Sequence, residues 1–221
     1  MSSVSKFDVV HASFGHLKYM RRSHALYMRE LITTYDIEYV LELGTYHGKG
    51  TAYLAAILED LGRGRVTTLD RCDCLRHSPN VHEVLAEVGL EHRVDVRLHP
   101  RSFTMTLMQM LEAHPRPTFD LCYLDGAHTW DGTGFAFFLI DKLLTPGGWL
   151  VMDDLDWTIA GSPSYRAAEA SGLTHPWTQY SVEEKEMRQV RKVWDLLVGE
   201  AGYTRHEEKH LGWGIARKPL R

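Results

Sequence analysis

The stretch Val40-Leu41-Glu42-Leu43-Gly44-Thr45-Tyr46-His47-Gly48-Lys49-Gly50-Thr51 decides the fold, because a short apolar run gives way to three glycines and then to a helix-compatible sequence. We interpret it as a strand that leads into a ligand-binding turn. Gly44, Gly48 and Gly50 allow a close approach of the backbone or a positive φ. Their spacing is GxxxGxG, and not the GxGxxG that sets a pyrophosphate against a helix N-terminus. This looser turn, preceded by Glu42, suits a ligand that lacks phosphate and carries a cationic end.

The composition favours one α/β domain that binds a small molecule. The chain has 221 residues, and 25 Lys plus Arg against 29 Asp plus Glu give a formal charge of −4. No general basic field therefore argues for a nucleic-acid partner. The apolar runs are too short for a membrane span, so no membrane partner is expected.

The start of the chain and the cysteines favour a cytoplasmic location. Met1-Ser2-Ser3-Val4-Ser5-Lys6 lacks the charged segment and the apolar core of an export signal. The three cysteines, Cys72, Cys74 and Cys122, cannot form a fully paired framework. Cys72 and Cys74 have no matching second pair, so free thiols are favoured over a metal site.

Apolar strands alternate with amphipathic stretches along the chain, which is the signature of an α/β fold. Strands are expected at residues 38–43, 66–70, 94–98, 119–124 and 149–152. Helices are expected at residues 17–34, 49–61, 81–88, 102–114 and 135–144.

The alternation stops after the fifth strand. Residues 156–180 read as a long loop, which is either a surface excursion or a lid over the strand ends. Ser181-Val182-Glu183-Glu184 then opens a helix with a capping box that runs to about Val198. Two short strands at 202–204 and 213–216 are close in sequence and must pair antiparallel.

Acidic residues end four of the expected strands. Glu42, Asp70, Asp125 and Asp153 should converge on the crevice where open α/β sheets bind ligands. Asp70 lies 28 positions after Glu42, near the offset at which nucleotide-binding folds place a carboxylate on the ribose. Asp70 is therefore the strongest candidate for a nucleoside anchor.

These residues resemble class I S-adenosylmethionine-dependent methyltransferases, nearest to the metal-dependent small-molecule enzymes of the catechol O-methyltransferase type. Residues 40–50 match the first motif of that family, Asp70 matches its second-strand acid, and residues 119–125 match its fourth-strand motif. Asp125-Gly126-Ala127-His128 and Met152-Asp153-Asp154 are also similar to bacterial methyltransferases that modify sugars, antibiotics and similar metabolites.

The resemblance covers about residues 38–154 and completes the expected architecture. It implies an α/β fold with a Rossmann-like, doubly wound, seven-stranded and mostly parallel sheet, an antiparallel C-terminal hairpin, flanking helices and an N-terminal helical extension. One domain is expected, with a helical cap (1–36), a cofactor-binding core (37–154), a lid insertion (155–180) and a C-terminal helix and hairpin (181–221). The first 30 residues and the lid lie outside the resemblance.

The resemblance implies S-adenosyl-L-methionine as the cofactor. Asp70 would hold its ribose, and Glu42 would lie beneath its methionine portion or would instead bond loop amides. Tyr46 would flank the same portion and Ser102 the adenine, although a turn aromatic and a helix cap are ordinary roles for them. Gly44, Gly48, Gly50 and Asp125 complete the expected cofactor site.

Asp125, Asp153 and Asp154 form a second candidate site. Three carboxylates near one point repel one another unless a cation is present, and an all-oxygen set suits Mg²⁺, with Mn²⁺ or Ca²⁺ as alternatives. The family places its metal ligands at these positions, often with an amide where this chain has Asp154. Bonds to backbone amides or capping of the following turn are the ordinary alternatives.

His128 lies three residues beyond Asp125, where catechol-type enzymes carry a basic lysine. A neutral imidazole, with a reference pKa of about 6.5, can accept a proton from a hydroxyl, so His128 and Asp125 are the candidate catalytic pair. A hydrogen bond to metal or cofactor, or a surface position, would equally explain His128. His47 is a weaker candidate base.

The predicted function is methyl transfer to a hydroxyl of a small molecule, assisted by a divalent metal. A diol, catechol, sugar or other secondary metabolite would be the acceptor, with Trp130 and Trp157 as walls or rim of its pocket. A metal-independent O- or N-methyltransferase with His128 as base is the alternative. An NAD-dependent oxidoreductase and a noncatalytic cofactor-binding protein are less favoured, and self-association into a homo-oligomer stays open.

Overall fold

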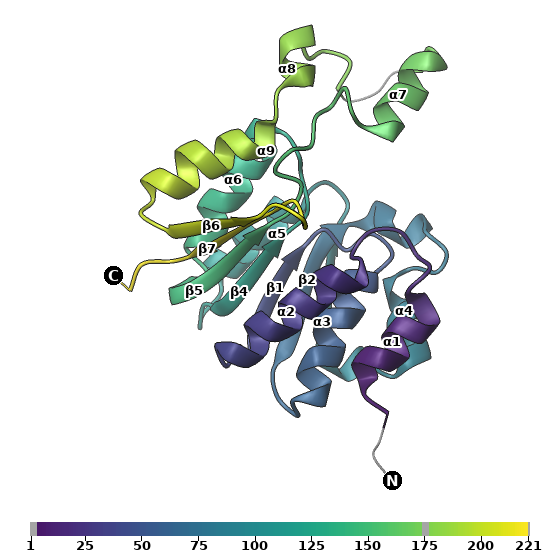
Figure 1. The fold of residues 1–221 in the computed structure, drawn as a ribbon, viewed down its shortest axis with the longest axis vertical. Coiled ribbons are helices and arrows are strands. Elements are labelled where there is room, and N and C mark those ends of the chain that lie inside the picture. Colours follow the sequence, from purple (N-terminus) through teal and green to yellow (C-terminus); the bar gives the residue numbers. More distant parts are fainter. Residues whose placement is uncertain (1–3, 174–176, 221) are drawn as a thin grey trace.

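A computed structural model of the chain describes residues 4–173 and 177–220, so residues 174–176 of the predicted lid lie outside the described part. Seven strands form one sheet in the order β3-β2-β1-β4-β5-β7-β6 (Figure 1). Strands β1 to β5 are parallel, whereas β7 is antiparallel to both β5 and β6. The strands are β1 Tyr39–Leu43, β2 Arg65–Arg71, β3 Val94–His99, β4 Phe119–Leu124, β5 Leu144–Met152, β6 Thr204–Glu208 and β7 Trp213–Arg217. This arrangement confirms the predicted fold class.

Helices cover both faces of the sheet (Figure 1). The first face is covered by α1 Lys6–Phe14, α2 Arg22–Thr34, α3 Lys49–Asp60 and α4 Val81–Val88. The second face is covered by α5 Phe103–Glu112, α6 Trp130–Asp141, α9 Gln189–Lys192 and the π-helical turn η3 Val193–Val198. Two short 3₁₀ turns, η1 Cys72–Arg76 and η2 Glu91–Arg93, connect elements. Within the described residues, no helix combines the length and apolar content needed to cross a bilayer.

Side-chain alternation along β1 divides the core into two layers. Val40 faces the helices of the first face, while Leu41 and Leu43 face α5 and α6. Successive side chains of a strand point to opposite faces, so Glu42 points with Val40 toward α3. The one acidic residue of β1 is therefore buried beneath the turn that begins α3.

The N-terminal section differs from the single helix expected at 17–34. Two helices, α1 and α2, are separated by an irregular segment in which Tyr19 and Met20 have φ values of 61° and 33°. Ser5 caps α1 by accepting from the backbone N–H of Asp8. Left-handed residues cannot continue a right-handed helix, so the chain bends and brings residues 17–20, here called the strap, over the ends of the strands.

The C-terminal section also departs from expectation. The helix expected at 181–198 breaks at Met187, which is extended, between α8 Val182–Glu186 and α9. The Gln189 side chain stabilises this break, because its amide nitrogen donates to Glu184 O and its amide oxygen accepts from Trp130 N at 2.7 Å. Strand β6 occupies most of the charged segment that was expected to be a turn.

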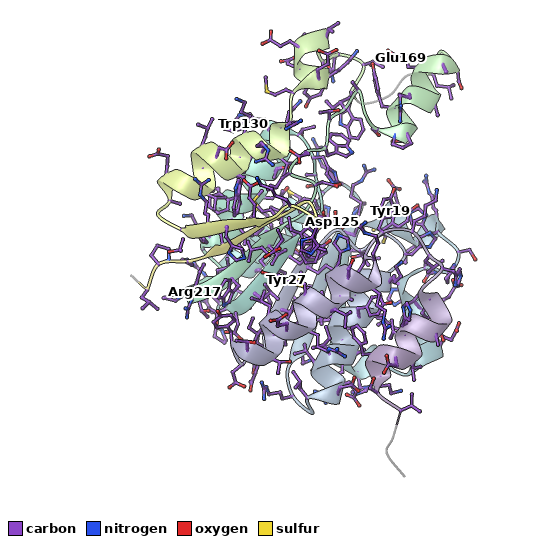
Figure 2. All side chains as sticks on the ribbon, in the orientation of Figure 1. Tyr19, Tyr27, Asp125, Trp130, Glu169 and Arg217 are labelled. Atoms are coloured by element: carbon purple, nitrogen blue, oxygen red, sulfur yellow. The ribbon has the colours of Figure 1, made fainter. Side chains whose placement is uncertain are left out.

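The segment after β5 is more regular than predicted. It contains α7 Pro163–Ala170, which Ser162 caps and Pro163 begins, the preferred arrangement at a helix start. Helices α7 and α8 stand apart from the sheet and its helical layers. Figure 2 shows Glu169 of α7 far out, whereas Tyr19 lies beside Asp125 near the middle of the molecule.

Candidate functional site

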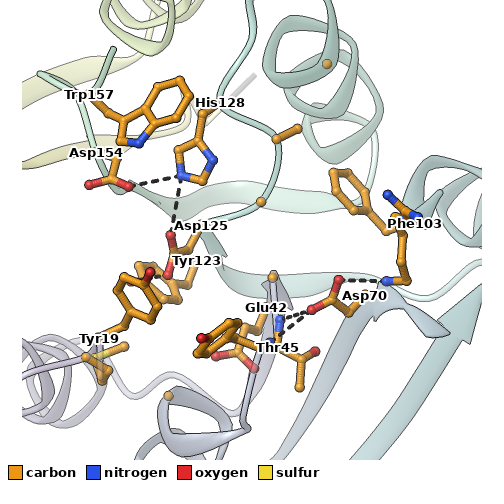
Figure 3. Close-up of a pocket in the computed structure, with 18 of the residues that line it drawn as sticks. Tyr19, Glu42, Thr45, Asp70, Phe103, Tyr123, Asp125, His128, Asp154 and Trp157 are labelled. Carbon is orange, nitrogen blue, oxygen red and sulfur yellow. Dashed lines mark hydrogen bonds and ion pairs between the residues drawn. The ribbon is translucent and has the colours of Figure 1, made fainter. Parts of the chain in front are cut away.

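A pocket of about 1020 Å³ opens at the carboxyl ends of β1, β2 and β4 (Figure 3). At one end lies the glycine turn, residues 44–50, and at the other lie Asp125, His128 and Asp154, here called the Asp–His group. This is the position where strand order reverses in the sheet, between β1 and β4. Open α/β sheets bind ligands at such a reversal.

The three glycines of the turn serve different contacts. Gly44 has φ +101°, and a Cβ there would lie 2.4 Å from the carbonyl oxygen of Asp125, so β1 and β4 approach each other through it. At Gly50 a Cβ would lie 2.8 Å from Glu42 Oε1, inside the pocket. Gly48 does not line the pocket, because it packs against Val81 of α4.

Asp70 holds the glycine turn from β2. Its Oδ2 accepts hydrogen bonds from the backbone N–H groups of Thr45 at 2.8 Å and Tyr46 at 2.9 Å. Its Oδ1 accepts from the N–H of Arg71 at 2.6 Å. The turn is thus fixed in shape by a carboxylate that also lines the pocket.

Glu42 is 1% exposed and lies beneath the same turn. Its Oε2 accepts from the hydroxyls of Thr51 and, at 2.7 Å, Thr68. Burial raises the pKa of Glu42 to about 7, and the charge of Asp70 acts in the same direction against the two hydroxyl donors. Oε1 faces Gly50 and the pocket, so a cationic ligand group there would favour the ionised form.

The Asp–His group brings three side chains from two loops to one point. His128 Nε2 lies 3.0 Å from Asp154 Oδ2 and 3.8 Å from Asp125 Oδ1. Although Nε2 is buried, no described residue forms a well-aligned hydrogen bond with it. Removal from water raises the pKa of Asp125 well above its usual value, and the charges of Asp153 and Asp154 add to the shift.

This group has the chemistry of a cation site. One ligand atom from each of Asp125, His128 and Asp154 lies within 4.8 Å of the others. The two carboxylates suit a divalent ion such as Mn²⁺ or Mg²⁺, whereas an imidazole is a ligand that Zn²⁺, Fe²⁺ and similar ions prefer. The unaligned Nε2 and the crowded carboxylates are groups that such an ion would satisfy.

Asp153, the third predicted carboxylate, lies outside the described lining of the pocket. Its Oδ2 accepts from the phenol of Tyr123 at 2.6 Å, and its Oδ1 accepts from the N–H of Asp154 at 2.7 Å. Removal from water raises the pKa of Asp153, and the charge of Asp154 adds to this shift. The possible ligand atoms of Asp125, His128 and Asp154 therefore lie together, and Asp153 stays close to both acids through its charge and its hydrogen bonds.

Three further predicted residues have structural contacts as well as pocket positions. Ser102 caps α5 by accepting from Thr104 N at 3.1 Å, and it lines the pocket. The ring of Tyr46 packs against Tyr19 with a centroid distance of 5.0 Å. His47 binds the carbonyl oxygen of Pro79 through Nδ1.

Aromatic side chains wall the pocket beside the Asp–His group. The Trp157 ring lies 4.9 Å from the His128 ring, and Trp177 packs edge-on against Trp157 at 5.2 Å. Figure 3 shows Trp157 alongside His128, with Tyr19 nearer to Asp125. Trp130, the other predicted wall, is 41% exposed and does not belong to the described lining.

Sequence reasoning missed three residues of the site. Lys49 is buried and donates to the carbonyl oxygen of Leu17, which ties the strap to α3. Tyr19 enters from that strap, where no motif signals it. Tyr123 was detectable, because it precedes Asp125 by two positions on one strand and must therefore share its face.

The sequence matches a family model described as a methyltransferase domain over residues 41–155, which is just over half of the chain. The matched range contains the glycine turn, Asp70 and the whole Asp–His group. Among proteins of curated function, no sequence match was found.

Solved structures share the fold across almost the whole chain. A Staphylococcus aureus protein classed as a caffeoyl-CoA O-methyltransferase superposes with a TM-score of 0.66 at 20% identity, covering 97% of this chain and 93% of that one. The Bacillus cereus O-methyltransferase in complex with SAH gives 0.64 at 18% identity, with coverages of 99% and 92%. The O-methyltransferase TomG from Streptomyces achromogenes, in complex with SAM, gives 0.61 at 21% identity, with coverages of 99% and 90%.

Proposed function

We propose that this chain, which belongs to the methyltransferase domain family, transfers the methyl group of S-adenosylmethionine to an oxygen atom of a small molecule. The observation that carries the proposal is one continuous pocket that joins the glycine turn to the Asp–His group. The first end suits a nucleoside with a cationic chain, and the second suits a hydroxyl that must lose a proton. The SAH and SAM complexes of proteins with the same fold support the choice of donor.

The donor would lie along the glycine turn. Asp70, beside Arg71 on the rim, would face the ribose, and Ser102 with Phe103 would border the adenine. Glu42 would face the positively charged methionine portion through Oε1, while Tyr46 would flank that portion. Because Asp70 and Glu42 already bond the turn and its threonines, the donor would enter a preformed site, which limits the entropy lost on binding.

Asp125 and Asp154, with His128 as the third donor, would hold a divalent ion at the acceptor end. When bound, such an ion lowers the pKa of an acceptor hydroxyl and fixes its orientation. In the transfer, the acceptor oxygen forms a bond to the methyl carbon as the carbon–sulfur bond breaks, leaving S-adenosylhomocysteine. The hydroxyl proton leaves to solvent or to a base of the pocket.

A metal-independent route is the second candidate, and the position of His128 favours it. A nitrogen lone pair serves either a metal or a proton at one time. Without an ion, Nε2 would accept the hydroxyl proton, and Asp154 at 3.0 Å would stabilise the resulting imidazolium. Trp157, Trp177 and Tyr19 would then still border a diol, a catechol, a sugar or a similar acceptor.

Removal of metal separates the two routes. The full chain, freed of tightly bound metal and assayed with labelled S-adenosylmethionine and a panel of catechols and sugars, should lose turnover by about 10²-fold or more in excess EDTA. Its affinity for S-adenosylhomocysteine, measured by calorimetry, should remain. Full turnover in EDTA would select the metal-independent route, and failure to bind either nucleoside would contradict the proposed function itself.

A further inference from the structure

The outer face of α6 carries two adjacent phenylalanines. Helix α6 packs its inner side on the sheet through buried residues such as Phe137 and Ile140. Phe135 and Phe138, by contrast, are 53% and 54% exposed. Their rings are nearly parallel, with centroids 6.4 Å apart. Single apolar residues are ordinary on a protein surface, but adjoining aromatic rings are typical of a binding surface.

Two exposed charged residues lie at the ends of the same face. Asp131 is in the first turn of α6, and Lys142 is its C-cap. At 3.6 residues per turn, positions 131, 135, 138 and 142 fall within about 60° of one another around the helix axis. We call these four residues the α6 row. An acid at the start of a helix and a base at its end complement the helix dipole, which explains the two charges but not the two phenylalanines.

The α6 row is complementary to a reversed copy of itself. Phe135 and Phe138 are equally far in sequence from the midpoint between positions 136 and 137. The same is true of Asp131 and Lys142. In an antiparallel pair with a two-fold axis at that midpoint, Phe135 therefore faces Phe138 of the second copy. Asp131 likewise faces Lys142 of the second copy, whereas a parallel pair would place like charges together.

We propose that α6 pairs in antiparallel orientation with α6 of a second copy of this chain, which makes the protein a two-fold dimer. The phenylalanine rings of both copies form the centre of the contact, and each end carries an ion pair between Asp131 and Lys142. No residue of the α6 row lines the pocket. The proposal is therefore independent of the proposed function.

The two charges of the row are available for a second copy. Lys142 Nζ lies 4.2 Å from the centroid of its own Phe138 ring, which holds the ammonium group at the edge of the apolar area. Asp131 receives a long hydrogen bond of 3.4 Å from the phenol of Tyr180. An ion pair with the second copy would be stronger than this hydrogen bond.

Neighbouring helices add apolar area to the same layer. Helix α6 packs against α5 and η3. Met105 and Met108 are exposed on α5, and Leu196 is exposed on η3. A stable interface covers about 800 Å² on each partner, which is more than one helical row supplies. These side chains would provide part of the remaining contact.

Sedimentation velocity of the full chain from about 1 to 100 μM measures the dimer Kd. Phe135→Ser should raise this Kd about 30-fold or more, because a two-fold interface loses the aromatic ring twice. Tyr39→Ser is the matched control, since Tyr39 is a 52% exposed aromatic residue at the start of β1. It should leave the Kd unchanged. Both variants should keep the wild-type far-UV circular dichroism spectrum, because both positions are exposed.

Reversing the charges tests the antiparallel orientation. Asp131→Lys and Lys142→Asp should each raise the Kd of self-association about tenfold at low ionic strength, since each variant places like charges opposite one another. Mixed in equal amounts, the two variants should associate with each other about as tightly as the wild type does with itself, because opposite charges then meet at both ends. Energy transfer between separately labelled variants measures this association.

Three outcomes would overturn the proposal. The first is a wild-type chain that stays monomeric over the whole concentration range. If its binding to phosphatidylcholine vesicles is then lost in Phe135→Ser, the face contacts lipid instead. The second is an equal rise of the Kd in Phe135→Ser and Tyr39→Ser, which would place the dimer contact elsewhere. The third is a mixture of the two charge variants that associates no better than either variant alone.

Discussion

The two ends of the pocket differ in how far the protein satisfies its own polar groups. At the glycine turn, Asp70 accepts three backbone N–H groups and Glu42 Oε2 accepts two hydroxyls. In the Asp–His group, the buried Nε2 of His128 has no aligned partner among the described residues, and carboxylates crowd one another. The first end is complete before a ligand arrives, and the second end is not.

This difference indicates that the two ends of the pocket have different roles. A preformed turn binds a donor with little rearrangement, and its affinity depends on shape. The charged side chains of the Asp–His group instead become ordered when a cation or a proton binds among them. Substitutions should therefore separate into those that change the shape of the turn and those that change the acceptor end.

The largest effect is expected where the two ends meet, at Gly44. Gly44→Ala places a Cβ 2.4 Å from the backbone oxygen of Asp125 and imposes φ +101° on a residue with a side chain. We expect a loss of about 3 kcal/mol or more of unfolding free energy, together with loss of S-adenosylhomocysteine binding. Urea unfolding and calorimetry measure the two quantities.

Gly62→Ala is the control for backbone strain alone. Gly62 has φ +70°, and no atom of the described residues lies within 4 Å of its hypothetical Cβ. It should cost about 1 kcal/mol and leave nucleoside binding intact. Equal losses of unfolding free energy and of nucleoside binding in the two variants would mean that Gly44 and Asp125 are not tightly packed. The comparison between the two ends of the pocket would then be wrong.

An intermediate effect is expected for Glu42, and it depends on pH. Burial raises the pKa of Glu42 to about 7 from its ordinary value of 4.5. Below pH 4.5 both states are protonated, and from there to pH 7 the unfolded chain ionises while the folded one stays neutral. The folded state therefore loses about 3 kcal/mol across that interval from this group alone.

Glu42→Gln should abolish this part of the pH dependence. Relative to the wild type, the unfolding free energy of the variant should rise by about 3 kcal/mol between pH 4.5 and pH 7, as measured by urea titrations at several pH values. The comparison with the wild type cancels the contributions of Asp125 and Asp153. A difference that stays constant with pH would show that folding does not raise the pKa of Glu42.

The smallest effect is expected at Tyr19, which belongs to the acceptor end. Tyr19→Ala removes the edge-on contact with Tyr46 and one wall of the pocket. The KM for the acceptor should rise roughly fivefold, equivalent to about 1 kcal/mol, without a change in nucleoside affinity. Tyr35→Ala, at an exposed tyrosine whose ring packs at a tilt against Trp149 away from the pocket, should leave both quantities unchanged.

Local sequence patterns indicated the residues at the donor end of the pocket. The GxxxGxG spacing and the alternation of β1 are local features of one strand and its turn, and the acid at the end of β2 is marked by its place at a strand end. The parallel direction of β1 to β5 could be expected because strands separated by helices pair in parallel. The position of Ser102 as a cap of α5 follows equally local rules.

The acceptor end was less predictable, because side chains far apart in sequence decide it. Asp125 and Asp154 line the pocket, whereas Asp153 accepts from the phenol of Tyr123, and three acids after strand ends do not reveal that difference. The strap depends on Lys49, which reaches back across 32 positions to the carbonyl of Leu17. Neither hydrogen bond corresponds to a periodic pattern in the sequence from which it could be predicted.

The strap and the segment after β5 share a consequence for how such a protein can change. Both lie outside the parallel strands, and both supply walls to one end of the pocket, through Tyr19, Trp157 and Trp177. Neither belongs to the paired register of β1, β2 and β4. Residues 17–20 and 155–173 are therefore the targets for changing the acceptor, provided that the contact of Tyr19 with Tyr46 is kept.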